Sequence, residues 1–133
     1  MRFNVLVTGA LYSSQSGYSA LQFCRASIAL GHDITQVFFY QDAVNQANVL
    51  STPLDDEFNA VESWIDFSKQ NNVDLVVCVS AAERRGVMET EQVKEFSKEP
   101  ANGFGNLHPI FSVAGLGVLH EASLESDRTV TFK

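Results

Sequence analysis

Short apolar runs alternate with amphipathic stretches along the whole chain, and this alternation limits the possible folds more than any other feature. The apolar runs have the length of strands, while the stretches between them repeat their apolar residues at the helical period. A strand, a helix and a second strand in succession form a βαβ unit, whose two strands lie parallel. We therefore predict an α/β fold with one mostly parallel sheet of five strands and helices on both of its faces.

The strand expected at residues 74–79 is the most buried of the five. Its centre, Leu75 to Val79, is a near-continuous apolar run, which is typical of a central parallel strand that is covered on both faces. The other strands are expected at residues 3–7, 34–40, 110–113 and 128–132. These patterns do not define the order of the strands in the sheet.

Helical segments are expected at residues 19–30, 80–85, 89–98 and 115–125, and residues 41–48 form a short helix or a loop. A further helix is expected to begin at Thr52 and Pro53, which suit the N-cap and the first helical position. The acidic residues 55–57 complement the positive end of that helix, and Asn71 with Asn72 ends it. Its buried stripe is expected to comprise Leu54, Phe58, Val61 and Ile65.

The charge and length of the chain exclude several classes of function. Nine basic residues against sixteen acidic ones give a net charge of −7, so we expect no direct binding of nucleic acid, which requires cations to neutralise phosphates. No apolar run approaches the roughly 18 residues of a membrane span, and the N-terminus indicates a first strand rather than a signal peptide. We expect one domain over residues 1–133, located in the cytoplasm.

The two cysteines, Cys24 and Cys78, have different surroundings. No CxxC pair and no histidine cluster accompanies either one, so we expect no structural zinc, no other cofactor and, in a reducing cytosol, no disulfide. Cys24 falls in the middle of the apolar face of its helix, which favours a packing role. Cys78 lies at the end of the strand at 74–79, and ligands of open α/β sheets bind outside the carboxyl ends of the strands.

Cys78 is therefore the residue best placed for chemistry. If the turn at Ser80 and Ala81 begins a helix, its free N–H groups lie close to the sulfur. A thiolate beside such groups, or beside Arg84 or Arg85, has a pKa below the usual value of about 8.5. These are the needs of a nucleophilic or sulfur-carrying cysteine. The alternative is that Cys78 is a small core residue, since free cysteines are among the most buried residues.

Two further segments follow the carboxyl ends of expected strands. The turn from Tyr12 to Gly17 offers hydroxyl and N–H groups before a helix, which fits either an anion site or a solvated turn. The segment from Gly115 to Gly117 begins like a dinucleotide-binding motif, but His120 stands at the third glycine and too few residues follow, so we expect no dinucleotide site. The three histidines are scattered, and none lies within ten residues of Cys78.

The segment from Cys78 to Val87 resembles the active-cysteine segment of the TusD/DsrE family of sulfur-relay subunits. The likeness extends over nearly the whole chain in matching order, through residues 2–9, 19–23, 31–40, 112–117 and 121–128. Two stretches depart from the family pattern. The first turn, Gly9 to Tyr12, lacks the proline of many members, and residues 96–108 look variable, but neither departure touches Cys78.

The resemblance implies a DsrE-like fold with flavodoxin-like layering, and a sulfurtransferase that carries sulfur as a persulfide on Cys78. It implies two smaller paralogous subunits, TusB/TusC-like or DsrH/DsrF-like, in a heterohexamer with two copies of each subunit, together with a TusA-like sulfur donor and a TusE-like or DsrC-like acceptor. In the TusD branch the relay serves 2-thiouridine at the tRNA wobble position, and in the DsrE branch it serves sulfur oxidation. A non-catalytic subunit that binds an anion or acts as a scaffold is the other alternative.

Overall fold

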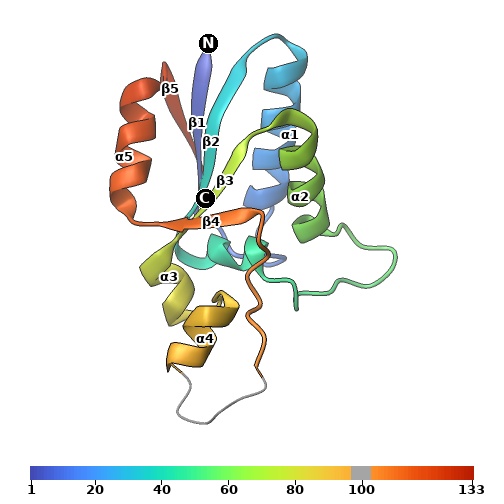
Figure 1. Ribbon diagram of the computed structural model, residues 1–133. Coiled ribbons are helices and arrows are strands. Elements are labelled where there is room, and N and C mark those ends of the chain that lie inside the picture. The colour runs from blue at the N-terminus through green and yellow to red at the C-terminus, as the bar shows by residue number, and fades with distance from the viewer. Residues whose placement is uncertain (97–102) are drawn as a thin grey trace.

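The strands and helices of the molecule follow one another in the predicted alternation (Figure 1). The structure is a computed structural model, and it describes residues 1–96 and 103–133. The elements in chain order are β1 (Arg2–Val7), α1 (Ser16–Ala29), β2 (Asp33–Phe39), the 3-10 helix η1 (Gln41–Ala47), α2 (Ala60–Asn71), β3 (Asp74–Cys78), α3 (Val79–Arg84), α4 (Thr90–Phe96), β4 (Phe111–Ala114), α5 (Leu116–Glu125) and β5 (Arg128–Phe132).

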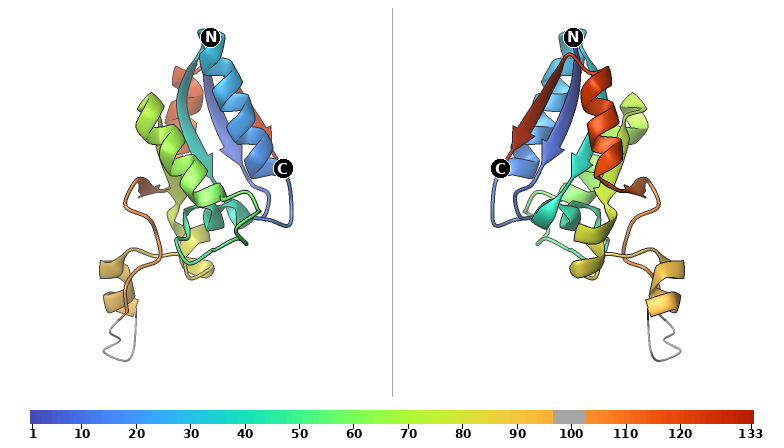
Figure 2. Two further views of the ribbon diagram at one scale, coloured as in Figure 1. Left: turned by 90° about the vertical axis from the view of Figure 1, so that its right-hand side faces the viewer. Right: turned by 90° about the vertical axis from the view of Figure 1, so that its left-hand side faces the viewer.

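The five strands form one sheet in the order β4-β3-β2-β1-β5, and every neighbouring pair is parallel. The chain steps in one direction from β1 to β4 and then returns past β1 to place β5. Because parallel crossovers are right-handed, this reversal puts α5 on the face opposite α1 and α2. Figure 2 shows α1 and α2 together on one side of the sheet and α5 on the other, which confirms the predicted α/β architecture.

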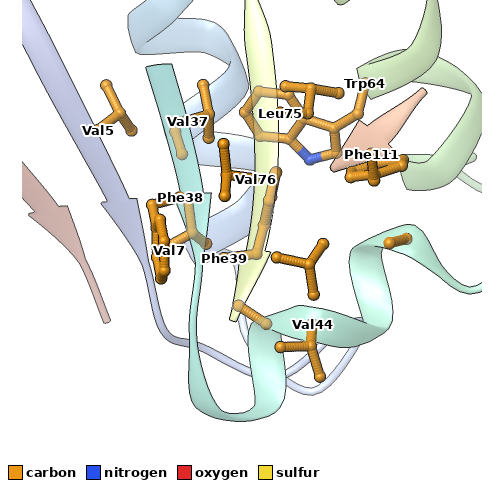
Figure 3. Close-up of a cluster of buried hydrophobic side chains, with 14 of the residues drawn as sticks. Val5, Val7, Val37, Phe38, Phe39, Val44, Trp64, Leu75, Val76 and Phe111 are labelled. Atoms are coloured by element: carbon orange, nitrogen blue, oxygen red, sulfur yellow. The ribbon is translucent and has the colours of Figure 1, made fainter. Parts of the chain in front are cut away.

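The main core lies between the sheet and the helices α1 and α2, and its largest side chains are aromatic rings set among valines (Figure 3). Phe39 of β2 packs edge to face on Trp64 of α2, with ring centroids 5.2 Å apart, and also contacts Phe111 of β4 at 5.7 Å. The indole N–H of Trp64 is buried but satisfied, since it donates to Gln46 Oε1 of η1 over 3.1 Å. This packing fixes η1 at the carboxyl edge of the sheet.

The opposite face is fastened by polar groups. Asn4 of β1 is fully buried, and its Nδ2 donates to Ser123 Oγ of α5 over 2.9 Å. Helix α5 otherwise covers little, because Ala122 is its one buried residue while Leu116, Val118 and Leu124 are exposed. No helix in the described ranges combines the length and the apolar character that crossing a membrane requires.

The predicted start of the second long helix is wrong. Helix α2 begins at Ala60 rather than near Thr52, and its N-cap is Asn59, whose Oδ1 accepts from the Glu62 N–H. A local turn takes the place of the expected first turn, since Glu57 accepts from the Leu54 N–H through Oε2 and donates its own N–H to the Leu54 carbonyl. Leu54 is therefore 70% exposed. The buried face is formed instead by Ala60, Val61, Trp64, Phe67 and Ser68.

Other boundaries shift by a few residues. Helix α1 begins three residues earlier than expected, and the short turn expected at 80–85 is a helix that begins directly after Cys78. The expected helix at 89–98 is observed as α4, and its residues 97 and 98 lie outside the described residues. Strand β5 has the predicted bounds.

Asn72 offers a test of the turn that leads from α2 into β3. Its backbone is left-handed, with φ of 52° and ψ of 45°, a conformation that glycine adopts freely and that asparagine tolerates. Asn72→Ala should lower the free energy of unfolding by about 1 kcal/mol, while Asn72→Gly should leave it nearly unchanged. Urea denaturation measures both values, and an alanine variant as stable as the glycine variant would contradict this account.

Candidate functional site

Cys78 lies where the interior strand β3 turns into a helix. It is the last residue of β3 and the N-cap of α3, with extended backbone angles of φ −64° and ψ 120°. The β-branched residues Val76 and Val77 favour the strand, and the helix-compatible segment Ala81 to Arg84 favours the helix that follows. The cysteine is thus held at the carboxyl edge of the sheet, where open α/β folds place their ligands.

The sulfur is covered in the isolated chain. Cys78 is only 1% exposed, and it stands in register with Ala114 of the neighbouring strand β4. Because side chains alternate along a strand, Cys78 points to the face that carries α5. Ser80, two residues further on, is exposed, and its Oγ lies 3.6 Å from the Cys78 Sγ. Ser80 is therefore a polar group between the sulfur and solvent.

The other predicted site residues lie further along α3. Ala81 is 3% exposed and contributes its backbone N–H to the first turn of the helix, but the Cys78 side chain makes no capping hydrogen bond. Arg85 turns away, since its Nε donates to Asp42 Oδ1 over 2.8 Å and its Nη1 to the Ala81 carbonyl over 3.1 Å. Arg84 is exposed in the last turn. Helix α3 thus brings Ser80 to the sulfur, while Arg84 at its end lies about 9 Å from Cys78 along the helix axis.

Asp42 is the residue near this site that the sequence analysis missed. It follows β2 directly, in the first turn of η1, and its carboxylate holds Arg85 against the sheet edge. A signal for it was present, because any polar residue just after a parallel strand belongs to the same edge as Cys78. Its pairing with an arginine more than forty positions along the chain depends on the order of the strands.

Cys24 and the histidines do not join this site. Cys24 is completely buried in the core, and burial raises the pKa of its thiol to about 12. The Nδ1 of His108 accepts the Ile110 N–H over 3.1 Å, and burial, helped by the charge of Lys69, lowers the pKa of this histidine. Within residues 1–96 and 103–133, no group of three or more His, Cys, Asp or Glu side chains could hold a metal ion.

The molecule is thus an α/β protein with an all-parallel sheet. Its candidate site is a thiol at the carboxyl edge of that sheet, where a helix begins. Residues 1–132 of the chain match the DsrE/DsrF-like family. The chain belongs to this family, as the resemblance at Cys78 to Val87 and along the chain predicted.

Two known proteins are similar to the chain over nearly its whole length. It is 42% identical over 132 residues to a protein of Salmonella newport (strain SL254) named Sulfurtransferase TusD, covering 99% of this chain and all of that protein. Its fold is similar to the crystal structure of the ychN protein from E. coli, with a TM-score of 0.73 at 23% sequence identity over 99% of this chain and all of the other. That second likeness concerns the fold alone.

Cys24 should resist iodoacetamide as long as the protein stays folded. With a pKa of about 12, only about one Cys24 in a thousand is a thiolate at pH 9, and the thiolate is the reactive form. Cys24 should therefore stay unmodified in the native protein from pH 7 to pH 9 and react readily in urea. Peptide mass spectrometry measures both conditions, and a Cys24 adduct formed at pH 8 without denaturant would contradict the burial described here.

Proposed function

We propose that this chain is a sulfurtransferase subunit that carries sulfur as a persulfide on Cys78 and passes it from one protein to another. One observation carries the proposal: a cysteine ends the interior strand β3 at the carboxyl edge of the sheet, beside a hydroxyl and the first turn of a helix. The family membership and the full-length likeness to a protein named as a sulfurtransferase support the same activity.

The transfer needs two displacement steps. In each step one S–S bond breaks and another forms, so no external oxidant or reductant is required. The Cys78 thiol first loses its proton, and the thiolate attacks the outer sulfur of a donor persulfide. The S–S bond of the donor breaks, a new S–S bond forms on Cys78, and the donor leaves as a thiolate. An acceptor thiolate then attacks the outer sulfur on Cys78, and Cys78 leaves as a thiolate again.

Ser80 is the side chain that we assign to stabilise the anionic sulfur. Its hydroxyl can donate to the Cys78 Sγ at the observed separation of 3.6 Å. The backbone N–H groups of α3, that of Ala81 among them, add the positive end of the helix. Arg84 is the arginine free to turn toward a bound partner, whereas Arg85 is already paired with Asp42.

The burial of Cys78 sets a condition on this mechanism. A sulfur that is 1% exposed cannot be reached by a donor cysteine, so docking of the partner must move the start of α3 or the groups above it. The same burial favours a second candidate function, in which the chain is a non-catalytic scaffold subunit and Cys78 is a core residue. The two functions differ in whether the relay needs the sulfur of Cys78.

The resemblance at Cys78 supports a specific setting for the relay. We propose that it ends in 2-thiouridine at the tRNA wobble position, and that sulfur oxidation is the alternative destination. The chain would act in the cytoplasm, assembled with two smaller paralogous subunits as a heterohexamer, between a TusA-like donor and a TusE-like or DsrC-like acceptor. With a net charge of −7, the chain is suited to contact these proteins rather than the tRNA itself.

Labelled sulfur tests the proposed carrier. The protein, alone and assembled with its partner subunits, is incubated with a persulfide donor that carries ³⁵S in its outer sulfur, and the adduct is mapped by mass spectrometry. Cys78→Ser should abolish the label, whereas Cys24→Ser, the matched control, should retain it. Label that persists on Cys78→Ser would refute the carrier, and a Cys78→Ala complex with normal relay activity would establish the scaffold instead.

Ser80→Ala tests the role of the hydroxyl. Hydrogen bonds to charged groups contribute about 1.5–3 kcal/mol when buried, and the exposure of Ser80 reduces this value, so sulfur uptake should slow by about threefold to tenfold. Ser80→Thr keeps the hydroxyl and should restore the rate of uptake, while an alanine variant with an unchanged rate would remove Ser80 from the mechanism.

A further inference from the structure

The first turn of α5 crosses the carboxyl end of β3, where Cys78 lies. Strand β4 ends at Ala114, in register with Cys78, and α5 begins two residues later. The Leu119 carbonyl of α5 already accepts from the Asn4 Nδ2 of β1 over 3.5 Å. Strands β3 and β2 lie between β4 and β1, so residues 115–118 pass over their ends. Because Cys78 points to this face of the sheet, the start of α5 covers its sulfur.

Helix α5 is held by few apolar contacts. Ala122 is its one buried residue, and Leu119 packs partly against the core. Its remaining large apolar residues, Leu116, Val118 and Leu124, are exposed even with the helix in place. Helix α1, on the opposite face, buries six residues. The hydrophobic effect scales with the apolar area removed from water, so lifting α5 costs less than lifting α1.

The attachment of α5 to the sheet is mainly polar. The Ser123 Oγ accepts from the Asn4 Nδ2 over 2.9 Å and from the Thr129 Oγ1 over 3.2 Å. At the far end of the helix, the Ser126 and Thr35 hydroxyls share a hydrogen bond of 2.8 Å. Water can replace each of these partners when the helix moves away, so the net loss per hydrogen bond is small.

Two polar atoms in this layer lack partners. The Asn4 Oδ1 and the Gln36 Nε2 are buried, and neither makes a hydrogen bond within the described part of the chain. The two residues stand opposite each other on β1 and β2, and both therefore face α5. A buried polar group without a partner is uncommon and destabilising. Opening the helix lets water reach both atoms, which relieves this cost and favours the movement.

Helix α3, the other element next to the sulfur, is fixed more firmly. Ala81 and Ala82 are buried, and the Val87 N–H donates to the Ala82 carbonyl over 2.9 Å. Arg85 joins the end of α3 to Asp42 of η1 through a hydrogen-bonded ion pair. Moving α3 breaks core contacts as well as this pair, so α5 is the element that moves more easily.

We propose that α5 is a cover that lifts from the sheet to open the Cys78 sulfur to a partner protein, and that the polar layer of Asn4, Gln36 and Ser123 makes this movement easy. The inference rests on the proposed function of Cys78 as a sulfur carrier, and it names the element that docking must move. With α5 in place, the sulfur is shielded from oxidants in solution between transfers.

Alkylation of Cys78 in the native protein tests the cover. Ser123→Ala removes the acceptor of the Asn4 Nδ2 and should raise the rate of Cys78 alkylation by iodoacetamide about threefold to tenfold, the factor that one neutral hydrogen bond corresponds to. Ser68→Ala is the matched control, because it removes a buried serine hydrogen bond from α2 on the opposite face and should leave the rate unchanged. Cys24 should stay unmodified in both variants, which shows that the whole chain has not unfolded.

An unchanged Cys78 rate in Ser123→Ala, or an equal rise in Ser68→Ala, would overturn the proposal. Gln36→Met provides a test in the other direction, also if Ser123→Ala fails to fold. It replaces the unpaired amide by an apolar side chain of similar shape, so Cys78 alkylation and hydrogen exchange of the α5 amides should both slow about threefold or more. Slower exchange in α5 with an unchanged Cys78 rate would show that α5 does not cover the sulfur.

These measurements need no sulfur donor, so they separate the cover from the carrier. If the ³⁵S label persists on Cys78→Ser, the carrier fails, whatever the alkylation rates are. If Cys78 carries the label but its alkylation does not respond to Ser123→Ala and Gln36→Met, the carrier stands and the cover is refuted.

Discussion

The indole of Trp64 joins the parts of the molecule that have to meet at the carboxyl edge of the sheet. Its ring packs against Phe39 of β2 and Phe67 of its own helix, and its N–H is held by Gln46 of η1. Strand β2, helix α2 and η1 are therefore fixed relative to one another by one fully buried side chain. The position of Asp42, which holds Arg85, follows from where η1 lies.

The two cysteines occupy different kinds of position in the fold. Cys24 lies in the middle of a helix, surrounded by core residues, and burial keeps its thiol protonated. Cys78 is almost as well covered, yet it stands at the end of a strand. The Ser80 hydroxyl and the first turn of α3, which no side chain of Cys78 caps, lie beside it. Position in the fold, rather than exposure in the isolated chain, separates the candidate carrier from the structural thiol.

The sequence predicted those features that depend on local pattern. The apolar run at Leu75 to Val77 located the interior strand β3, and the change of composition after Cys78 located the helix that follows it. The start of α2 was misjudged because Thr52 satisfies the local rules for a cap, while the turn between Leu54 and Glu57 prevails in the folded chain. The strand order, the pairing of Arg85 with Asp42 and the covering of the sulfur arise from tertiary contacts that no local pattern encodes.

The place of β5 beside β1 bears on how the chain folds during synthesis. The Arg2 N–H donates to Asp127 across 125 positions of sequence, and β1 finds its outer neighbour only in residues 128–132. While the ribosome is still making the middle of the protein, one edge of β1 has no strand to pair with, and such edges recruit other chains. The pairing of β5 with β1 must therefore wait until β5 has emerged from the ribosome. Contacts between residues so far apart in sequence form slowly, which delays this step.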